Sequence, residues 1–220
     1  MYNSKRLNKI LECVPSVERV IDVGADHGKL THMLILSGKA KNVVATDISA
    51  PSLLKTVKLV KDHNLENVVK TVVSDGLTEL EKQNVNAGAV VIAGMGGNEI
   101  KSILTKAKNL ENFGTFVLQP MQDPDVVRSA LNALNASVMQ DIVLEERGKF
   151  YSIIVANFAG VPTPLNLTQI HLGKDYLTDK NEEYLGYVKF KRDRLLERKK
   201  YLTTKDLKIL QVCEKILNSK

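Results

Sequence analysis

The sequence predicts an α/β fold in which a mostly parallel, doubly wound sheet is followed by a small C-terminal α-helical domain. Through the first 160 residues, short apolar runs alternate with segments of helical periodicity. A glycine-containing turn, VGADHG, joins the first apolar run to the first helix of the sheet. After residue 160 the apolar runs stop and two long helical patterns follow. We therefore expect one domain over residues 1–160 and a helical hairpin over residues 161–220.

The first half of the chain reads as three strands with intervening helices. A short amphipathic helix should end near Pro15, and a second helix should end at Gly38. Ser49 or Pro51 should begin the third helix. The expected helices span residues 4–12, 29–38 and 49–64, and the expected strands span residues 20–23, 43–47 and 68–73.

The second half continues the alternation and then changes. We expect strands over residues 87–93 and 115–118, with a helix over residues 98–108 and another that Asp123 caps. Residues 137–145 and 150–158 read as a hairpin, which adds an antiparallel end to the sheet. Two prolines and a glycine over residues 160–164 mark the domain boundary. Helices over residues 179–200 and 204–217 should bury their apolar stripes only against each other.

Composition limits the setting in which the protein acts. The 220 residues suffice for one domain with a substantial core and a smaller appendage. The apolar runs are short and the N-terminus lacks an apolar leader, so we expect a cytoplasmic protein without membrane attachment. Cys13 and Cys213 should be reduced thiols, and the four histidines show no ligand spacing with cysteine, so we expect no metal site. We also expect a monomer.

The positive charge is concentrated in the C-terminal segment. From Gly160 to Lys220 the chain carries thirteen Lys and Arg against eight Asp and Glu, whereas the first 159 residues carry eighteen against seventeen. A basic appendage on a nearly neutral domain suggests a polyanionic partner, because neutralised phosphates release counterions. A solvated helix face is the alternative.

The turn after the first strand carries the residues that point to a ligand. Gly24 and Gly28 allow positive φ angles and close approach of a ligand to backbone N–H groups. Asp47 ends the second strand, where a carboxylate can accept both hydroxyls of an adenosine ribose. Asp26 would repel a pyrophosphate, which favours S-adenosylmethionine, a donor with sulfonium and ammonium groups, over a dinucleotide. An α/β turn without a ligand is the alternative.

Two further strand ends and one helix supply more candidates. Asp75 and Gly76 follow the third strand, where an adenine amino group could be met, although an Asp-Gly pair is also typical of a plain turn. The fourth strand runs into GMGG, Gly94–Gly97, whose bare backbone should face the ligand crevice. Arg6 could reach the carboxylate of a bound methionine moiety, or could be an exposed arginine with no such role.

Six motifs together resemble the bacterial tRNA (adenine-22-N1)-methyltransferase family. They are DVGADHG (22–28), ATD (45–47), SDGL (74–77), IAGMGG (92–97), LQP (118–120) and GKFY (148–151). Many methyltransferases share the glycine loop, whereas its combination with AGMGG is much narrower. Gly28 stands where the family often has alanine, a conservative departure at a turn. The similarity spans nearly the whole chain, including the helical tail.

The resemblance implies a Rossmann-like, seven-stranded methyltransferase sheet with a coiled-coil-like C-terminal domain. It implies S-adenosylmethionine as methyl donor and an adenosine in the D-region of tRNA, at position 22, as acceptor. The matching residues should surround the donor: Gly24, Asp26 and His27 at its methionine end, Asp47 and Ile48 at the ribose, Asp75 and Gly76 at the adenine, and Gly94, Met95 and Gly96 between donor and substrate.

Methyl transfer to adenine N1 requires alignment, because N1 already carries a lone pair. Asp26 is the candidate catalytic residue, since a carboxylate near the base would stabilise the positive charge that develops on the ring. Its alternative role is to hold the donor's ammonium group or the loop backbone. Gln119 and Pro120 are candidates for contacting the base edge, and Met95 for packing on its face.

In the basic tail, Arg194 and Arg198 are candidate contacts to the tRNA backbone. Two functions of other classes remain open. An NAD-dependent dehydrogenase is disfavoured by Asp26 and could be distinguished by the cofactor that stabilises the protein. A non-catalytic RNA-binding protein with a vestigial donor pocket would be distinguished by a methyl-transfer assay on unmodified tRNA.

Overall fold

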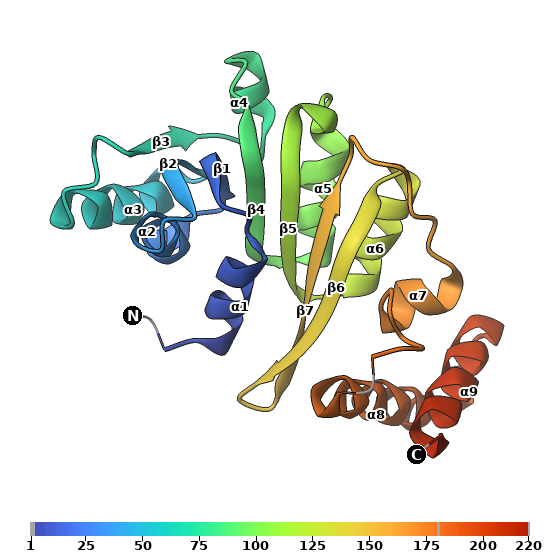
Figure 1. Cartoon of the computed structure of the whole chain (residues 1–220). Helices are drawn as coiled ribbons and strands as arrows, with labels where there is room; N and C mark the ends of the chain where they lie inside the picture. The colour runs from blue at the N-terminus through green and yellow to red at the C-terminus, as the bar shows by residue number, and fades with distance from the viewer. Residues whose placement is uncertain (1–2, 180, 220) are drawn as a thin grey trace.

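The computed structural model describes residues 3–179 and 181–219 and contains one seven-stranded sheet in the order β3-β2-β1-β4-β5-β7-β6 (Figure 1). The first five strands are parallel, whereas β7 pairs antiparallel with both β5 and β6. The strands are β1 Val17–Val23, β2 Ala40–Asp47, β3 Val69–Val73, β4 Ala87–Gly96, β5 Phe113–Gln122, β6 Ser137–Glu146 and β7 Lys149–Asn157. This arrangement confirms the predicted doubly wound sheet with a hairpin at one end.

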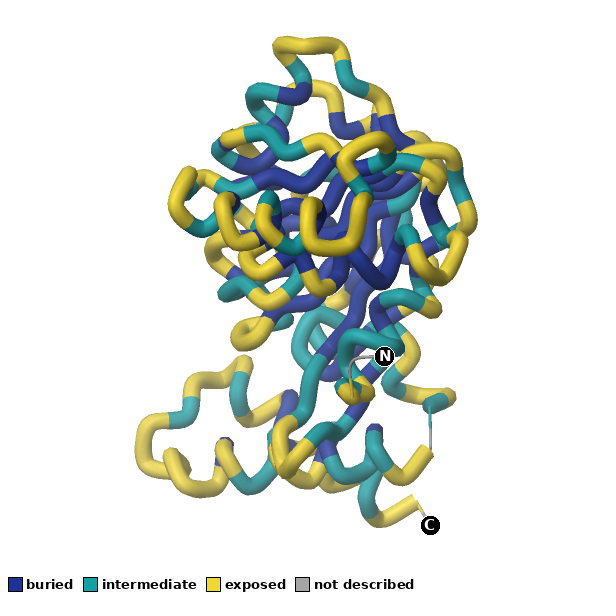
Figure 2. Tube along the Cα trace, turned by 90° about the vertical axis from the view of Figure 1, so that its left-hand side faces the viewer, coloured by how far each residue is buried: buried dark blue, intermediate teal, exposed yellow. Residues whose placement is uncertain are grey.

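Helices cover both faces of the sheet, so the domain has three layers (Figures 1 and 2). One face packs against α1 Lys5–Cys13, α2 Lys29–Leu36 and α3 Ala50–Asp62, and the other packs against α4 Thr78–Lys82, α5 Gly97–Lys106 and α6 Pro124–Ala133. Residues of β4 alternate between the two cores, which is why this central strand is apolar along its length. The sequence did not predict α4, which is only five residues long.

Two local expectations differ from the structure. The fourth strand does not end at residue 93: β4 continues through Gly96 with register shifts around Met95, and α5 begins at Gly97. A Cβ on Gly97 would lie 2.3 Å from the carbonyl oxygen of Asp123, so only glycine allows this approach. Asp123 precedes α6 as predicted, but its side chain makes no capping hydrogen bond, because its φ of 53° is left-handed whereas N-caps use extended backbone.

The C-terminal helices pack against the hairpin of β6 and β7 as well as against each other. They are α7 Leu167–Leu172, which the sequence did not predict, α8 Glu182–Glu197 and α9 Thr204–Asn218. Val143 of β6 belongs to their core and Phe150 of β7 packs against it, so the expectation that two helices bury their stripes only against each other is wrong. The hairpin extends beyond its neighbours in the sheet and lies beside α8 (Figure 1). Its apolar side chains belong there to the core of the C-terminal helices.

A buried ion pair connects the sheet to the segment that leads to these helices. Arg128 of α6 donates two hydrogen bonds, of 2.7 and 2.9 Å, to Asp141 of β6, and both side chains are fully buried. Arg128 also donates to the carbonyl of Ile170, while the backbone N–H of Lys174 donates to Asp141. Residues after 160 thus contact the first domain closely, and the boundary at 160/161 stays a prediction.

No helix within residues 3–179 and 181–219 is both long and apolar enough to cross a membrane.

Candidate functional site

The strand order reverses between β1 and β4, so the carboxyl ends of these two strands mark the expected ligand site, which we call the crevice. Ligands of open α/β sheets bind at such a point. The structure brings most of the predicted residues to this edge, because each follows or ends one of the strands: Gly24 and Asp26 after β1, Asp47 and Ile48 at β2, Asp75 and Gly76 after β3, and Gly94 and Met95 in β4.

The glycine loop after β1 has the backbone that its sequence predicts. Gly24 and Gly28 have φ angles of 76° and 62°. The N–H groups of Gly24 and Ala25 donate to the carbonyl of Thr46 at 2.7 and 2.9 Å, which fastens the loop to the end of β2. A Cβ on Gly24 would lie only 1.9 Å from the methyl group of Met95, so Met95 of the GMGG segment packs directly on the glycine loop.

Asp47 is half-buried at the end of β2 and uses one of its two carboxylate oxygens within the chain. Its Oδ1 accepts a hydrogen bond of 2.8 Å from the N–H of Ser49, the residue whose side chain caps α3. The other oxygen accepts no hydrogen bond from the described residues and is available to a ligand. Ile48 beside it is 69% exposed, which leaves an apolar surface next to the carboxylate.

Asp26 lies on the short 3-10 turn Asp26–Gly28, with its carboxylate directed to α3. It pairs with Lys55 at 2.9 Å and lies 3.4 Å from Nε2 of His27. The hydrogen bond from Lys55 keeps the pKa of Asp26 below its ordinary value, so the carboxylate is ionised at neutral pH. Such a group can attract a cation but is a weak general base.

At the end of β3, Asp75 pairs with Lys106 of α5 at 2.7 Å. Gly76 has a φ of 61°, and a Cβ there would lie 2.8 Å from Ile103. The turn is therefore packed closely against α5. A ligand that contacts Asp75 would meet a carboxylate that is already paired with Lys106. The pairing of Asp75 with Lys106 was not expected from the sequence.

Gln119 connects the crevice to the N-terminal helix. Its fully buried side chain accepts hydrogen bonds from the Gly94 N–H at 3.3 Å and from the guanidinium of Arg6, and donates to the carbonyl of Pro120 at 2.7 Å. Arg6 lies 5.5 Å from the centre of the Tyr151 ring. Gln119 thus holds Gly94 and Arg6 in place, and both of its polar ends are occupied within the chain.

Asp22, the first residue of the DVGADHG motif, has a structural role that the motif alone did not indicate. Asp22 of β1 is buried beneath the glycine loop, and its carboxylate accepts a hydrogen bond of 2.6 Å from Oγ1 of Thr31 in α2. Burial raises the pKa of Asp22 to about 6, although the hydrogen bonds from Thr31 oppose the shift. The sequence feature that indicates such a role is a charged residue, Asp22, within an otherwise apolar run. Asp22 holds α2 against β1 and so fixes the loop between them.

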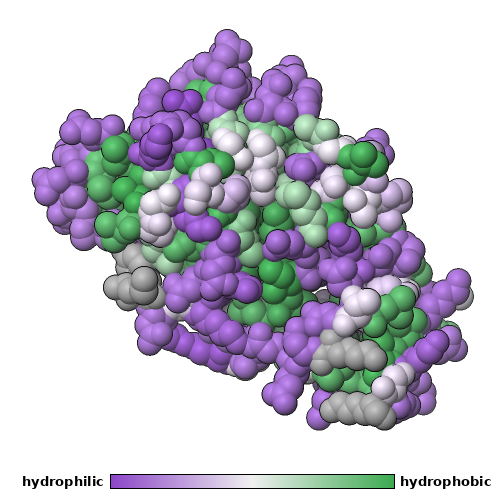
Figure 3. Space-filling view, in the orientation of Figure 1, coloured by the Kyte–Doolittle hydropathy of each residue, from purple (hydrophilic) through white to green (hydrophobic). Residues whose placement is uncertain are grey.

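A cleft of about 760 Å³ lies next to the crevice, between the sheet domain and the C-terminal helices. Its walls come from the end of β5, the start of β7, and helices α7, α8 and α9. The lining residues include Pro120, Met121, Gln122, Lys149, Phe150, Tyr151, Tyr187, Phe190, Lys191, Arg194 and Arg198. The face of the molecule in Figure 3 is largely hydrophilic, with hydrophobic residues exposed near its centre and on the C-terminal helices.

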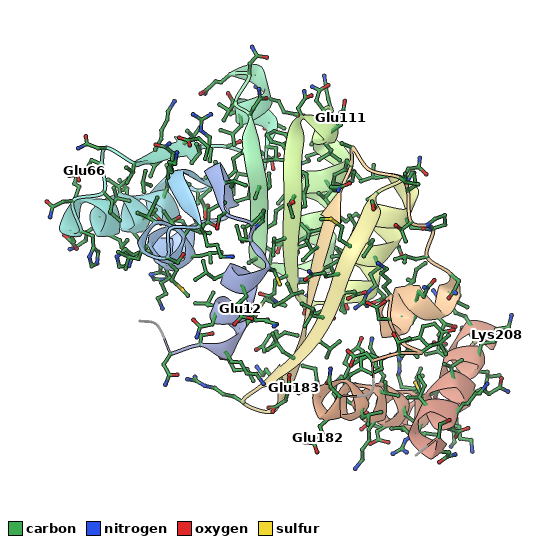
Figure 4. The ribbon with its side chains drawn as sticks, viewed as in Figure 1. Glu12, Glu66, Glu111, Glu182, Glu183 and Lys208 are labelled. Atoms are coloured by element: carbon green, nitrogen blue, oxygen red, sulfur yellow. The ribbon has the colours of Figure 1, made fainter. Side chains whose placement is uncertain are left out.

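The N-terminal helix also reaches this part of the molecule. Oγ of Ser4 donates to Glu146 at the end of β6, and Lys5 pairs with Glu183. Glu183 lies in the first turn of α8 (Figure 4). Arg6, on the same helix, contacts Gln119 at the crevice. The predicted residues thus fall into two neighbouring groups. The donor candidates and Arg6 lie at the crevice, whereas Pro120, Arg194 and Arg198 line the cleft.

Comparisons with known proteins agree with this architecture. Residues 3–154 match a family model described as a methyltransferase domain. A protein of Mycoplasma genitalium, named as a candidate tRNA methyltransferase, is 30% identical over 217 residues, which cover 98% of this chain and 97% of that protein. The tRNA (adenine(22)-N(1))-methyltransferase of Bacillus subtilis is 32% identical over 154 residues, 70% of this chain and 64% of that enzyme.

The likeness extends to solved structures. A crystal structure from Streptococcus pneumoniae, of a candidate tRNA (m1A22) methyltransferase in complex with S-adenosyl-L-methionine, superposes with a TM-score of 0.84 and 26% sequence identity. The alignment covers 97% of this chain and 99% of that chain. The similarity therefore includes the C-terminal helices as well as the sheet.

Proposed function

Since the chain belongs to the tRNA (adenine-22-N1)-methyltransferase family, with its S-adenosylmethionine-binding methyltransferase domain, we propose that it methylates N1 of the adenosine at position 22 of tRNA. The observation that carries the proposal is the junction of crevice and cleft. Met95, whose side chain lies over Gly24, pairs across the sheet with Pro120, which lines the cleft. A donor in the crevice and a base entering from the cleft would meet at this pair of strands.

The residues at the crevice suit S-adenosylmethionine. Gly94 has a φ of 81° and open space where a Cβ would stand, so a ligand can approach its backbone. Asp47 offers one carboxylate oxygen to the ribose hydroxyls, and Ile48 offers an exposed apolar surface beside it. The ionised Asp26 suits the ammonium and sulfonium groups of this donor and opposes a pyrophosphate. These features support the methyl donor over a dinucleotide.

The bound donor supplies an electrophilic methyl group; the C–S bond breaks as a bond to N1 of adenine forms. The protein therefore has to align two partners and to exclude water. Gln119 fixes the backbone of Gly94 on the donor side, while Pro120 and Met121 form the wall on the cleft side. The adenine ring gains the positive charge, so carboxylates near the base favour the transition state.

We propose that Asp26 acts chiefly on the donor. Its carboxylate is directed to Lys55, and its lowered pKa suits attraction of a cation. A direct catalytic role for Asp26 stays a prediction. Gln119 is proposed as a positioning residue rather than a reader of the base, because its amide is buried and fully hydrogen-bonded.

The cleft is the proposed tRNA site, with Arg194 and Arg198 as contacts to phosphates. Because one chain carries both the crevice and the cleft, we propose that the protein acts as a monomer, and in the cytoplasm, where tRNA is available.

The direct test is mass spectrometry of nucleosides from an unmodified tRNA transcript incubated with the protein and S-adenosylmethionine. We expect 1-methyladenosine, and none from a transcript with guanosine at position 22. Methylation of the guanosine-22 transcript would contradict the base assignment. Tight tRNA binding without any methylated nucleoside would favour the non-catalytic alternative.

A further inference from the structure

Helix α8 exposes an aromatic ring inside the cleft. Phe190 is 47% exposed, and it stands on a helix whose other solvent-facing residues are mostly charged. It lines the cleft together with Lys191 and Arg194. A single exposed apolar side chain is ordinary by itself, so the role of this ring has to be judged from the groups that surround it in the cleft.

The ring of Phe190 rests on a rigid aromatic base. Its centroid lies 5.8 Å from that of Phe150, which in turn lies 6.0 Å from Tyr187. Tyr187 is buried, and its hydroxyl donates to the carbonyl of His171 at 3.3 Å. Gly186 makes the arrangement possible, because a Cβ there would lie 3.1 Å from the ring of Phe150. Phe190 is the outermost of three rings, and the other two are held by the fold.

Cations surround this ring without acidic partners. In the described part of the chain, no carboxylate lies within 4 Å of the charged groups of Lys149, Lys191 or Arg198. Arg194 has only an exposed contact to Glu197 at 3.7 Å. Phe190 and Arg194 are four residues apart on one stripe of α8, with about 6 Å of rise between them, and Arg198 follows at the C-terminal cap of the helix.

The carboxylates in the cleft offset only part of this charge: hydrogen bonds from Thr203 and, to a smaller extent, the charge of Arg198 lower the pKa of Asp206. Asp206 is held in a capping box with Thr203, and Asp125 lies 3.7 Å from Nδ1 of His171. Asp123 precedes α6 and belongs to the cleft wall that the sheet domain forms, opposite α8. The wall formed by α8 is therefore aromatic and positively charged.

We propose that Phe190 stacks on an unpaired base of the tRNA, next to the adenosine that enters the crevice, while Arg194 and Arg198 contact adjacent phosphates. Stacked aromatic rings combined with a basic groove are the usual features of sites for unstacked nucleotides, because every base has a π face. An acidic protein segment would use the cations but not an exposed, flat ring. The inference rests on the proposed function, and it assigns to α8 a base contact as well as an electrostatic one.

The test uses the absence of tryptophan from this chain. Phe190→Trp introduces a single indole, whose fluorescence should be quenched when an unmodified tRNA transcript is added, with affinity close to that of the wild type. Leu207→Trp is the matched control, because Leu207 is 49% exposed on α9 but does not line the cleft. Its fluorescence should be unchanged by tRNA.

A second pair of variants separates stacking from simple packing. Phe190→Leu keeps an apolar side chain against Phe150 but removes the flat ring, and it should weaken tRNA binding about ten-fold, within the range for one stacked base. The defect should appear in KM for tRNA, with donor affinity by calorimetry at the wild-type value. The slope of log affinity against log salt should also stay unchanged, because the variant keeps every cation that meets a phosphate. Leu207→Ala should bind tRNA like the wild type.

Wild-type tRNA affinity in Phe190→Leu, or an unquenched indole in tRNA-bound Phe190→Trp, would overturn the stacking inference and leave the proposed function standing. Failure of the wild-type protein to bind tRNA would instead contradict the proposed function, and this inference with it. The two failures are therefore distinguishable in one set of titrations.

Discussion

Replacing Arg128 with methionine should strongly destabilise the protein. The guanidinium makes two hydrogen bonds to Asp141, one of 3.1 Å to Ser152 and one of 3.2 Å to the carbonyl of Ile170. Neither charged side chain is exposed, so Arg128→Met leaves the carboxylate of Asp141 buried with only the Lys174 N–H as a donor. Breaking a buried pair in this way costs about 3–5 kcal/mol.

For a chain of this length, that loss corresponds to a fall in melting temperature of about 6–20 °C. Calorimetry or denaturant unfolding measures it, with Arg192→Met as the matched control. Arg192 pairs with Asp193 at the surface, and such pairs contribute less than about 1 kcal/mol. The double variant Arg128→Met/Asp141→Leu should recover much of the loss, since no unpaired charge remains. A single variant as stable as the wild type would refute this reasoning.

Substitutions at five other residues probe the site and its surroundings. Asp47→Asn keeps an acceptor for the Ser49 N–H but loses the charge, and should weaken donor binding by about 10- to 150-fold in calorimetry; unchanged affinity would remove Asp47 from the site. Asp26→Asn should lower turnover only below saturating donor, and a defect that persists at saturation would show a catalytic role. Because burial raises the pKa of Asp22 to about 6, the folded state binds this proton more tightly than the unfolded state does, and the free energy of unfolding of the wild type should fall as pH rises from about 4 to 6. Asp22→Asn lacks this titration, so its free energy of unfolding should rise by about 3 kcal/mol relative to that of the wild type across the interval. Unfolding titrations measure the difference, and a difference that is constant with pH would contradict the prediction. Charge reversal at Arg194 and Arg198 should flatten the salt dependence of tRNA affinity by about one unit of slope for each phosphate that is no longer neutralised, whereas an unaltered slope would leave them as solvated charges.

The sheet could be predicted from the sequence because its signals are local. Buried parallel strands are continuously apolar, and the glycine turn after β1 requires the positive φ angles that Gly24 and Gly28 adopt. The hairpin of β6 and β7 was also predicted, since its alternation and its turn at Arg147–Gly148 are typical of antiparallel strands.

The missed features depend on contacts between distant segments. The continuation of β4 into GMGG depends on the backbone of Asp123, which lies against Gly97. The packing of α8 on Phe150 requires Gly186, whose role appears only when the hairpin and the helix are brought together. Distant contacts also explain what was missed at the site. Carboxylates at strand ends suggested that Asp26 and Asp75 contact a ligand, whereas in the structure each pairs with a lysine, 29 and 31 residues away in sequence.

The N-terminal helix has a consequence for the order of folding. Its apolar residue Ile10 packs in the same core as Leu34 of α2, which is synthesised soon afterwards. The polar residues at its start depend on partners much later in the chain: Arg6 on Gln119, 113 residues away, Ser4 on Glu146, 142 residues away, and Lys5 on Glu183, 178 residues away. Contacts of such separation form slowly, because the loops that they close are long. During translation, the first turn of the first helix must therefore wait for the second half of the chain, and the Arg6–Gln119–Gly94 arrangement at the crevice cannot be completed before β5 has been synthesised.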